Sequence, residues 1–149
     1  MMAAPNPDIV KAAFEQCGYE ISSEPLSEGA DDVFVGELIR DLPQTGVWFV
    51  KATAVVWNIA VYVDYLPGTE PRDEVKRFNF LIAIVKESYL ASCGRVGLHE
   101  THDHRLLLVC ETMLVHPEPA TTNCTTELRY RLEQLTSLVE AVQRLIDSY

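Results

Sequence analysis

The hydrophobic and polar positions of this chain follow two different periods, and each period is typical of a different secondary structure. Between Trp57 and Leu66 nearly every second residue is apolar and bulky, as in a strand with one buried face. From about Thr122 to Tyr149, apolar residues recur at spacings of four and three, as in an amphipathic helix. Turn residues such as proline and glycine separate the remaining segments. The predicted elements are a short helix ending before Gly18, strands at 33–39, 47–54 and 57–66, a helix at 71–92, strands at 95–99 and 105–115, and a helix at 122–149.

This order, helix-β-β-β-helix-β-β-helix, predicts an α+β fold in which helices flank a twisted antiparallel sheet. The 149 residues are 48% hydrophobic and 23% charged, which fits one ordinary globular domain, and we expect that domain to span residues 1–149. Residues 19–31 are rich in acidic residues, serine and glycine. We interpret them as an acidic loop with room for a short extended piece.

The helix predicted at 71–92 carries apolar residues on two opposite sides. One side has the spacing of a core-facing stripe, which we expect to pack on the sheet: Val75, Phe78, Ile82, Val85 and Tyr89. The opposite side contains Phe80, Ala83, Ile84, Glu87 and Ala91. Because the chain has no further element to cover this second side, we predict that it forms the interface of a homodimer. The alternative is a scatter of exposed apolar residues, which protein surfaces commonly carry.

The net charge limits the kinds of partner that the protein can bind. Twelve lysine and arginine residues against 22 aspartate and glutamate residues give a formal charge of −10. Nucleic acids and anionic membranes are bound mainly through cationic side chains, so we expect neither as a partner. Residues 1–46 hold nine acidic and two basic residues, which favours a basic protein partner. Solubility also explains part of this acidity.

Cysteine spacing and hydropathy indicate a cytoplasmic protein. The four cysteines form no CxxC pair, so neither a zinc site nor a thioredoxin motif is predicted. The chain does not open with the basic and apolar regions of a secretory signal. The longest apolar run, 47–63, is interrupted by polar residues, so we do not expect a membrane span.

The sequence contains none of the common motifs for binding phosphate, dinucleotides or catalytic zinc, and no nucleophilic serine elbow. We therefore predict no enzyme activity and no cofactor. One cluster has metal-binding chemistry: His99, His102 and His104 could hold Zn²⁺ or Ni²⁺. Alternate side chains of a hairpin point to opposite faces, so we interpret the cluster as a solvated turn and keep a metal site as the alternative. Cys93 and Cys110 are interpreted as structural thiols.

Several stretches resemble the class I chaperones of bacterial type III secretion, the Tir-chaperone-type family. They are 8–14 followed by Cys17-Gly18, the apolar helix 78–90 running into 94–98, the strand and turn 106–117, and the closing amphipathic helix. The resemblance covers nearly the whole chain and consists of hydrophobicity and turn placement. The YbjN-like proteins share a closely related fold and give a similar pattern.

The resemblance implies a cytoplasmic homodimer that binds an extended segment of a secreted effector and keeps it competent for export. It further implies dimerisation through the central helix and client binding by strand addition and pocket filling. In this chain the implied client surface comprises Val33, Val35, Leu38, Trp48, Val50, Asp31 and Asp32. A core position is the alternative for Trp48. A YbjN-like regulatory or interaction protein without a role in secretion is the alternative function.

Overall fold

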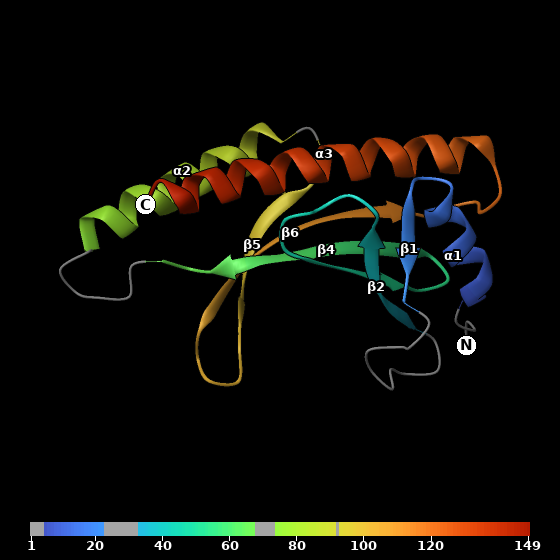
Figure 1. Ribbon diagram of the computed structural model, residues 1–149, viewed down its shortest axis with the longest axis horizontal. Coiled ribbons are helices and arrows are strands. Elements are labelled where there is room, and N and C mark those ends of the chain that lie inside the picture. Colours follow the sequence, from blue (N-terminus) through green and yellow to red (C-terminus); the bar gives the residue numbers. More distant parts are fainter. Residues whose placement is uncertain (1–4, 23–32, 68–73, 92) are drawn as a thin grey trace.

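The computed structural model describes residues 5–22, 33–67, 74–91 and 93–149. Within these residues the elements are α1 (Pro7–Glu15), β1 (Tyr19–Ile21), β2 (Phe34–Arg40), β3 (Val47–Ala52), β4 (Val56–Tyr65), α2 (Glu74–Leu90), β5 (Arg95–Glu100), β6 (Leu106–Val115) and α3 (Thr122–Asp147) (Figure 1). The predicted α+β class is confirmed. The predicted order also holds, with one additional strand, β1, after the first helix.

The described strands form a six-stranded antiparallel sheet in the order β1-β2-β3-β4-β6-β5. The edge strand β1 pairs with β2, so that Tyr19 lies opposite Arg40 and Ile21 lies opposite Leu38. β1 lies in the segment 19–31, which we interpret from the sequence as an acidic loop with room for a short extended piece. Three residues are too few to establish a period of two, so the sequence does not identify this piece as a strand. Its extended conformation depends on pairing with β2, which the local sequence does not reveal.

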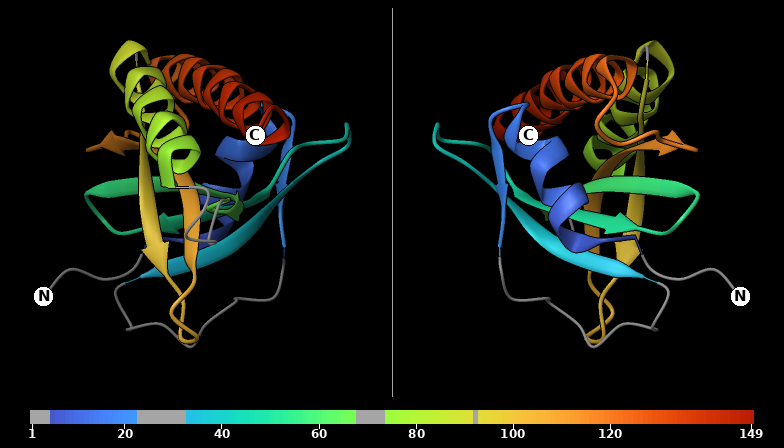
Figure 2. Two further views of the ribbon diagram at one scale, coloured as in Figure 1. Left: turned by 90° about the vertical axis from the view of Figure 1, so that its left-hand side faces the viewer. Right: turned by 90° about the vertical axis from the view of Figure 1, so that its right-hand side faces the viewer.

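The helices lie on one side of the sheet, with α3 running along it and α2 beside α3 (Figure 1, Figure 2). Alternate side chains of the central strands point into this helical layer and form the core. These core side chains are Trp48, Val50, Ala52, Trp57, Ile59, Val61, Leu108, Cys110 and Leu114. Trp57 stacks on Phe14 of α1, with the ring centroids 6.1 Å apart. Each large apolar side chain buried in this way contributes about 1.5–3 kcal/mol, so this layer is the main source of stability.

Local hydrogen bonds define the starts of α1 and α3. The Asn6 side chain accepts a bond from the Asp8 amide at 2.9 Å, and a proline follows Asn6 at the first helical position. The Thr121 hydroxyl accepts a bond from the Cys124 amide at 3.2 Å. α3 is strongly amphipathic, and no helix in the described part of the chain has the length and apolar composition of a membrane span.

The structure reverses the two sides of α2 relative to the prediction. Phe80 and Ile84 are each only 6% exposed and belong to the core. The Phe80 ring meets Tyr149, which follows α3, edge to face with 5.5 Å between centroids. Ala83, Glu87 and Ala91 are half-buried on the same side. The assignment of this side to an interface open to a partner was therefore wrong. Both sides have helical spacing, so only contacts distant in sequence decide which one faces inward.

Two adjacent residues of α2 test this orientation. Replacing Ile84 with alanine should lower the free energy of unfolding by about 2–4 kcal/mol, because the change leaves a cavity in the core. Replacing the exposed Val85 with alanine should change it by no more than about 0.5 kcal/mol. The measurement is urea unfolding at protein concentrations low enough that association does not contribute. A larger loss for Val85→Ala than for Ile84→Ala would contradict the orientation of α2.

Candidate protein-interaction surfaces

The outer side of α2 presents an apolar stripe to solvent. The α2 stripe consists of the exposed residues Val75, Phe78, Ile82, Val85 and Tyr89. Their spacings of three and four place them in one line along the helix. Phe78 and Val85 are 62% and 66% exposed, which is unusual for side chains of this kind aligned on one helix. The described residues therefore leave uncovered the side of α2 that the sequence predicts to pack on the sheet.

A second apolar surface lies on the side of the sheet that faces away from the helices, which we call the open face. Strand alternation places Phe49 of β3, Ala60 of β4 and Glu111 of β6 in one row across it. The next row contains Tyr62, Val109 and other residues. Together with neighbouring side chains they line a depression of about 730 Å³, which we call the hollow.

Small side chains form the base of the hollow, which we call its floor, and aromatic rings form one side of it, which we call the aromatic wall. Small side chains at Ala60 and Gly97 keep the floor low. The rings of the wall come from β3, β4 and β5: those of Phe49 and Tyr62 are 5.4 Å apart, and those of Tyr62 and His99 are 5.8 Å apart. Edge-on and tilted rings of this kind form an aromatic surface, which suits contact with apolar side chains of another protein.

The charges in the hollow differ from the strongly acidic average of the chain. Glu111 lines the hollow and forms an ion pair with Arg95, which lies outside the lining. Lys51 lines the hollow, is exposed, and has no ion-pair partner among the residues that the structure describes. Glu37 lies on the same face of β2, opposite Phe49, but outside the lining of the hollow. Lys51 is thus the charged residue of the lining that has no ion-pair partner among the described residues.

The structure places the client-binding residues that the family resemblance implies in different surroundings. Leu38, Trp48 and Val50 are at most 1% exposed and belong to the core, so their assignment as client contacts was wrong. The cause is strand alternation, which points these three side chains toward the helices. Val35 is half-buried and lines the hollow, and Val33 is half-buried just before β2. Asp31 and Asp32 lie outside the described residues. The sequence signal that was missed is the other set of alternate residues, above all Phe49 and Tyr62.

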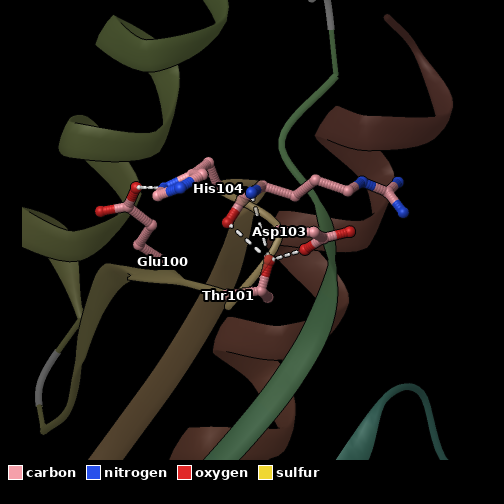
Figure 3. Close-up of polar contacts among 5 residues, drawn as sticks. Glu100, Thr101, Asp103 and His104 are labelled. Atoms are coloured by element: carbon pink, nitrogen blue, oxygen red, sulfur yellow. Dashed lines mark hydrogen bonds and ion pairs between the residues drawn. The ribbon is translucent and has the colours of Figure 1, made fainter.

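Hydrogen bonds fix the tip of the β5–β6 hairpin (Figure 3). The Thr101 amide donates to the Arg105 carbonyl at 2.8 Å, and the Arg105 amide donates to the Thr101 hydroxyl at 3.1 Å. Thr101 also donates to the Asp103 carboxylate, which holds the pKa of Asp103 below its usual value. His104 Nδ1 lies 3.0 Å from a Glu100 carboxylate oxygen. The tip is therefore an ordered turn.

The three histidines of this hairpin have different surroundings. His99 contacts Tyr62 on the open face, whereas His104 contacts Glu100 at the tip, and His102 is exposed. Within the described residues, no group of three histidine, cysteine, aspartate or glutamate side chains is placed to hold a metal ion. The arrangement favours the interpretation as a solvated turn.

Burial governs the chemistry of the thiols. It raises the pKa of Cys110 to about 12, and it is also the main cause of the raised pKa values of Cys17, Cys93 and Cys124. A raised pKa keeps a thiol protonated and weakly nucleophilic at neutral pH. These cysteines are therefore suited to packing.

Comparison with known proteins relates the fold to two solved structures. The chain matches no protein-family model and no curated protein. It is similar to YbjN from E. coli, a proposed transcription regulator, with a TM-score of 0.64 and 9% identity over 99% of this chain and 97% of YbjN. It is also similar to an uncharacterised protein from Methanothermobacter thermautotrophicus, with a TM-score of 0.63 and 11% identity over 95% of this chain and 97% of that protein. At these identities the likeness shows the fold alone, and it confirms the YbjN-like fold.

Metal analysis of the untagged protein tests the role of the histidine hairpin. We expect less than about 0.1 equivalent of zinc or nickel after dialysis, because the rings do not converge on one point. The variant His102→Ala should give the same value. Stoichiometric metal in the wild type that is lost in His102→Ala would establish a metal site at the hairpin.

Proposed function

We propose that this protein is a binding protein without catalytic activity, which pairs with a second copy through the α2 stripe and holds a client protein on the open face. The observation that carries this proposal is that the described residues leave two apolar surfaces uncovered, one on α2 and one on the sheet. Large contiguous apolar surfaces are uncommon on monomeric proteins and generally serve to bind other proteins.

The α2 stripe is suited to pairing with itself. Ile82 lies at its middle, so an antiparallel two-fold arrangement places the Val75 end of one helix near the Tyr89 end of the other. The spacing of three and four is that of a coiled-coil seam. At the described exposed positions of α2, Lys76 and Lys86 against Glu74 give a charge of +1, although the whole chain carries −10. Two copies can therefore approach here without strong repulsion.

We propose a type III secreted effector as the client, which the protein would keep competent for export. The stretches that resemble the class I secretion chaperones support this identity. The alternative client is a component of gene regulation, which the description of E. coli YbjN as a proposed transcription regulator supports. In both cases the net charge of −10 favours a protein partner over direct contact with nucleic acid.

Charge introduced into the α2 stripe tests the dimer. Val85→Glu should convert a dimer into a folded monomer, because it would bury an unpaired carboxylate in the interface without touching the core. The measurement is sedimentation equilibrium at micromolar concentration, with circular dichroism to confirm folding. Leu42→Glu is the matched control, since Leu42 is exposed in the β2–β3 turn and should tolerate the change. A wild type that is monomeric at about 100 μM would contradict the dimer.

Photo-crosslinking in the native host tests the client. A benzophenone amino acid at Met113, which is exposed on the open face, should capture one or a few specific proteins. The same group at the exposed Glu140 of α3 is the control and should capture none of them. Capture of a secreted protein supports the chaperone, and capture of a regulatory protein supports the alternative. If neither position captured a specific protein, the proposed function would be wrong.

A further inference from the structure

We infer that the hollow receives an amphipathic helix of the client, which lies with its apolar side on the sheet and places an acidic side chain beside Lys51. This inference rests on the proposed function, since it names the part of the client that the open face binds. For this surface it replaces the extended segment that the family resemblance implies.

The backbone of the sheet favours a helix over an extended segment. The edge strand β5 contributes Gly97, Leu98 and His99 to the lining of the hollow. The strands β3, β4 and β6 line the rest of its sheet surface apart from Val35 of β2, and each of these three is paired with a neighbouring strand on both sides. Their backbone N–H and C=O groups are therefore used within the sheet, and the open face offers only side chains to a ligand. An extended segment lying on this face would bury its own backbone groups without partners, which is unfavourable. A helix satisfies these groups internally.

The shape of the hollow suits the side chains of a helix. A Cβ atom added at Gly97 would meet no atom within 4 Å, so the space above the floor is open. On β4 the lining residue is Ala60, whose side chain is a single methyl group. Apolar side chains from successive turns of a helix can enter this space and lie against the aromatic wall of Phe49, Tyr62 and His99. This is the same layer arrangement, a helix on a sheet, that the chain uses on its other face.

The lysine in the lining of the hollow favours an acidic side chain at one edge of the apolar side of that helix. Of the two charged residues that line the hollow, Glu111 is paired with Arg95 outside the lining, and Lys51 has no ion-pair partner among the described residues. Burying a lysine ammonium beneath a ligand without a counter-charge is costly. An acidic side chain at the edge of the apolar stripe removes this cost and fixes the direction of the helix.

The probe is a hydrocarbon-stapled helical peptide that has a leucine stripe flanked by glutamates, titrated into the ¹⁵N-labelled full-length protein. We expect the amide signals of Lys51, Ala60 and Gly97 to shift. The same peptide with two central prolines cannot form the helix and should bind at least about tenfold more weakly. Equal binding of the two peptides, or shifts confined to α2 or α3, would overturn the inference.

Variants that fill the hollow make the test specific. Gly97→Leu should weaken binding of the helical peptide by at least about tenfold, because leucine occupies the open space above the floor. The control variant is Val115→Leu, which adds bulk on the open face of the sheet but outside the lining of the hollow. It should change binding by less than about twofold. Ala60→Leu takes the place of Gly97→Leu if the latter does not fold. Unchanged binding in the folded variant would overturn the inference.

A charge exchange tests the role of Lys51. Lys51→Glu should weaken binding of the glutamate peptide by about fivefold and strengthen binding of the corresponding lysine peptide. The crosslinking at Met113 separates the two proposals. If the client is captured equally well by wild type and Gly97→Leu, the helix inference is wrong but the proposed function stands. If wild type captures no client, the proposed function itself is wrong.

Discussion

Burial of one face of the sheet beneath the helices is the interaction on which the rest of the structure depends. Trp48 and Trp57 supply the largest buried side chains of that face, and the Phe14–Trp57 contact ties α1 to the central strands. The helices are all used on this side, so no described element is left for the other. The aromatic residues Phe49 and Tyr62 of the open face therefore stay partly accessible as a direct consequence of how the core is built.

The position of α2 follows from the same layer. Phe80 and Ile84 attach it to the core, and the Val96 amide at the start of β5 donates a hydrogen bond to the Ser88 hydroxyl at 3.1 Å. Lys76 lies over the Tyr149 ring at 4.5 Å. These contacts fix the rotation of α2 about its axis and turn the α2 stripe outward. One packing arrangement thus leaves two surfaces of the described residues uncovered, the α2 stripe and the open face of the sheet.

Much of the fold could be predicted from the sequence because its elements are long and regularly patterned. Two kinds of local signal are present: prolines and glycines at the ends of elements, and the periodic hydrophobic residues at 57–66 and 122–149. The pairing of the short extended piece β1 and the orientation of α2 could not be predicted, because each is decided by a partner that is distant in sequence: β2 for β1, and Tyr149 for Phe80. The client surface was misplaced for a related reason. Residues 47–50 are apolar on both faces, so alternation alone did not show whether Trp48 or Phe49 faces the core.

The distinction between the face of a sheet and its edge separates two ways of holding a client. An edge strand offers backbone groups and can order an extended segment, as strand addition requires. The open face offers side chains, so it selects a segment that already has its backbone hydrogen bonds. β5 pairs with β6 on one side. On its other side, the Leu98 amide has no backbone hydrogen-bond partner among the described residues, and the Leu98 side chain is half-exposed. A client that must stay unfolded for export would have to use such an edge as well, whereas a regulatory partner would need only the face. The relative use of face and edge by the same client therefore bears directly on which of the two functions this fold serves here.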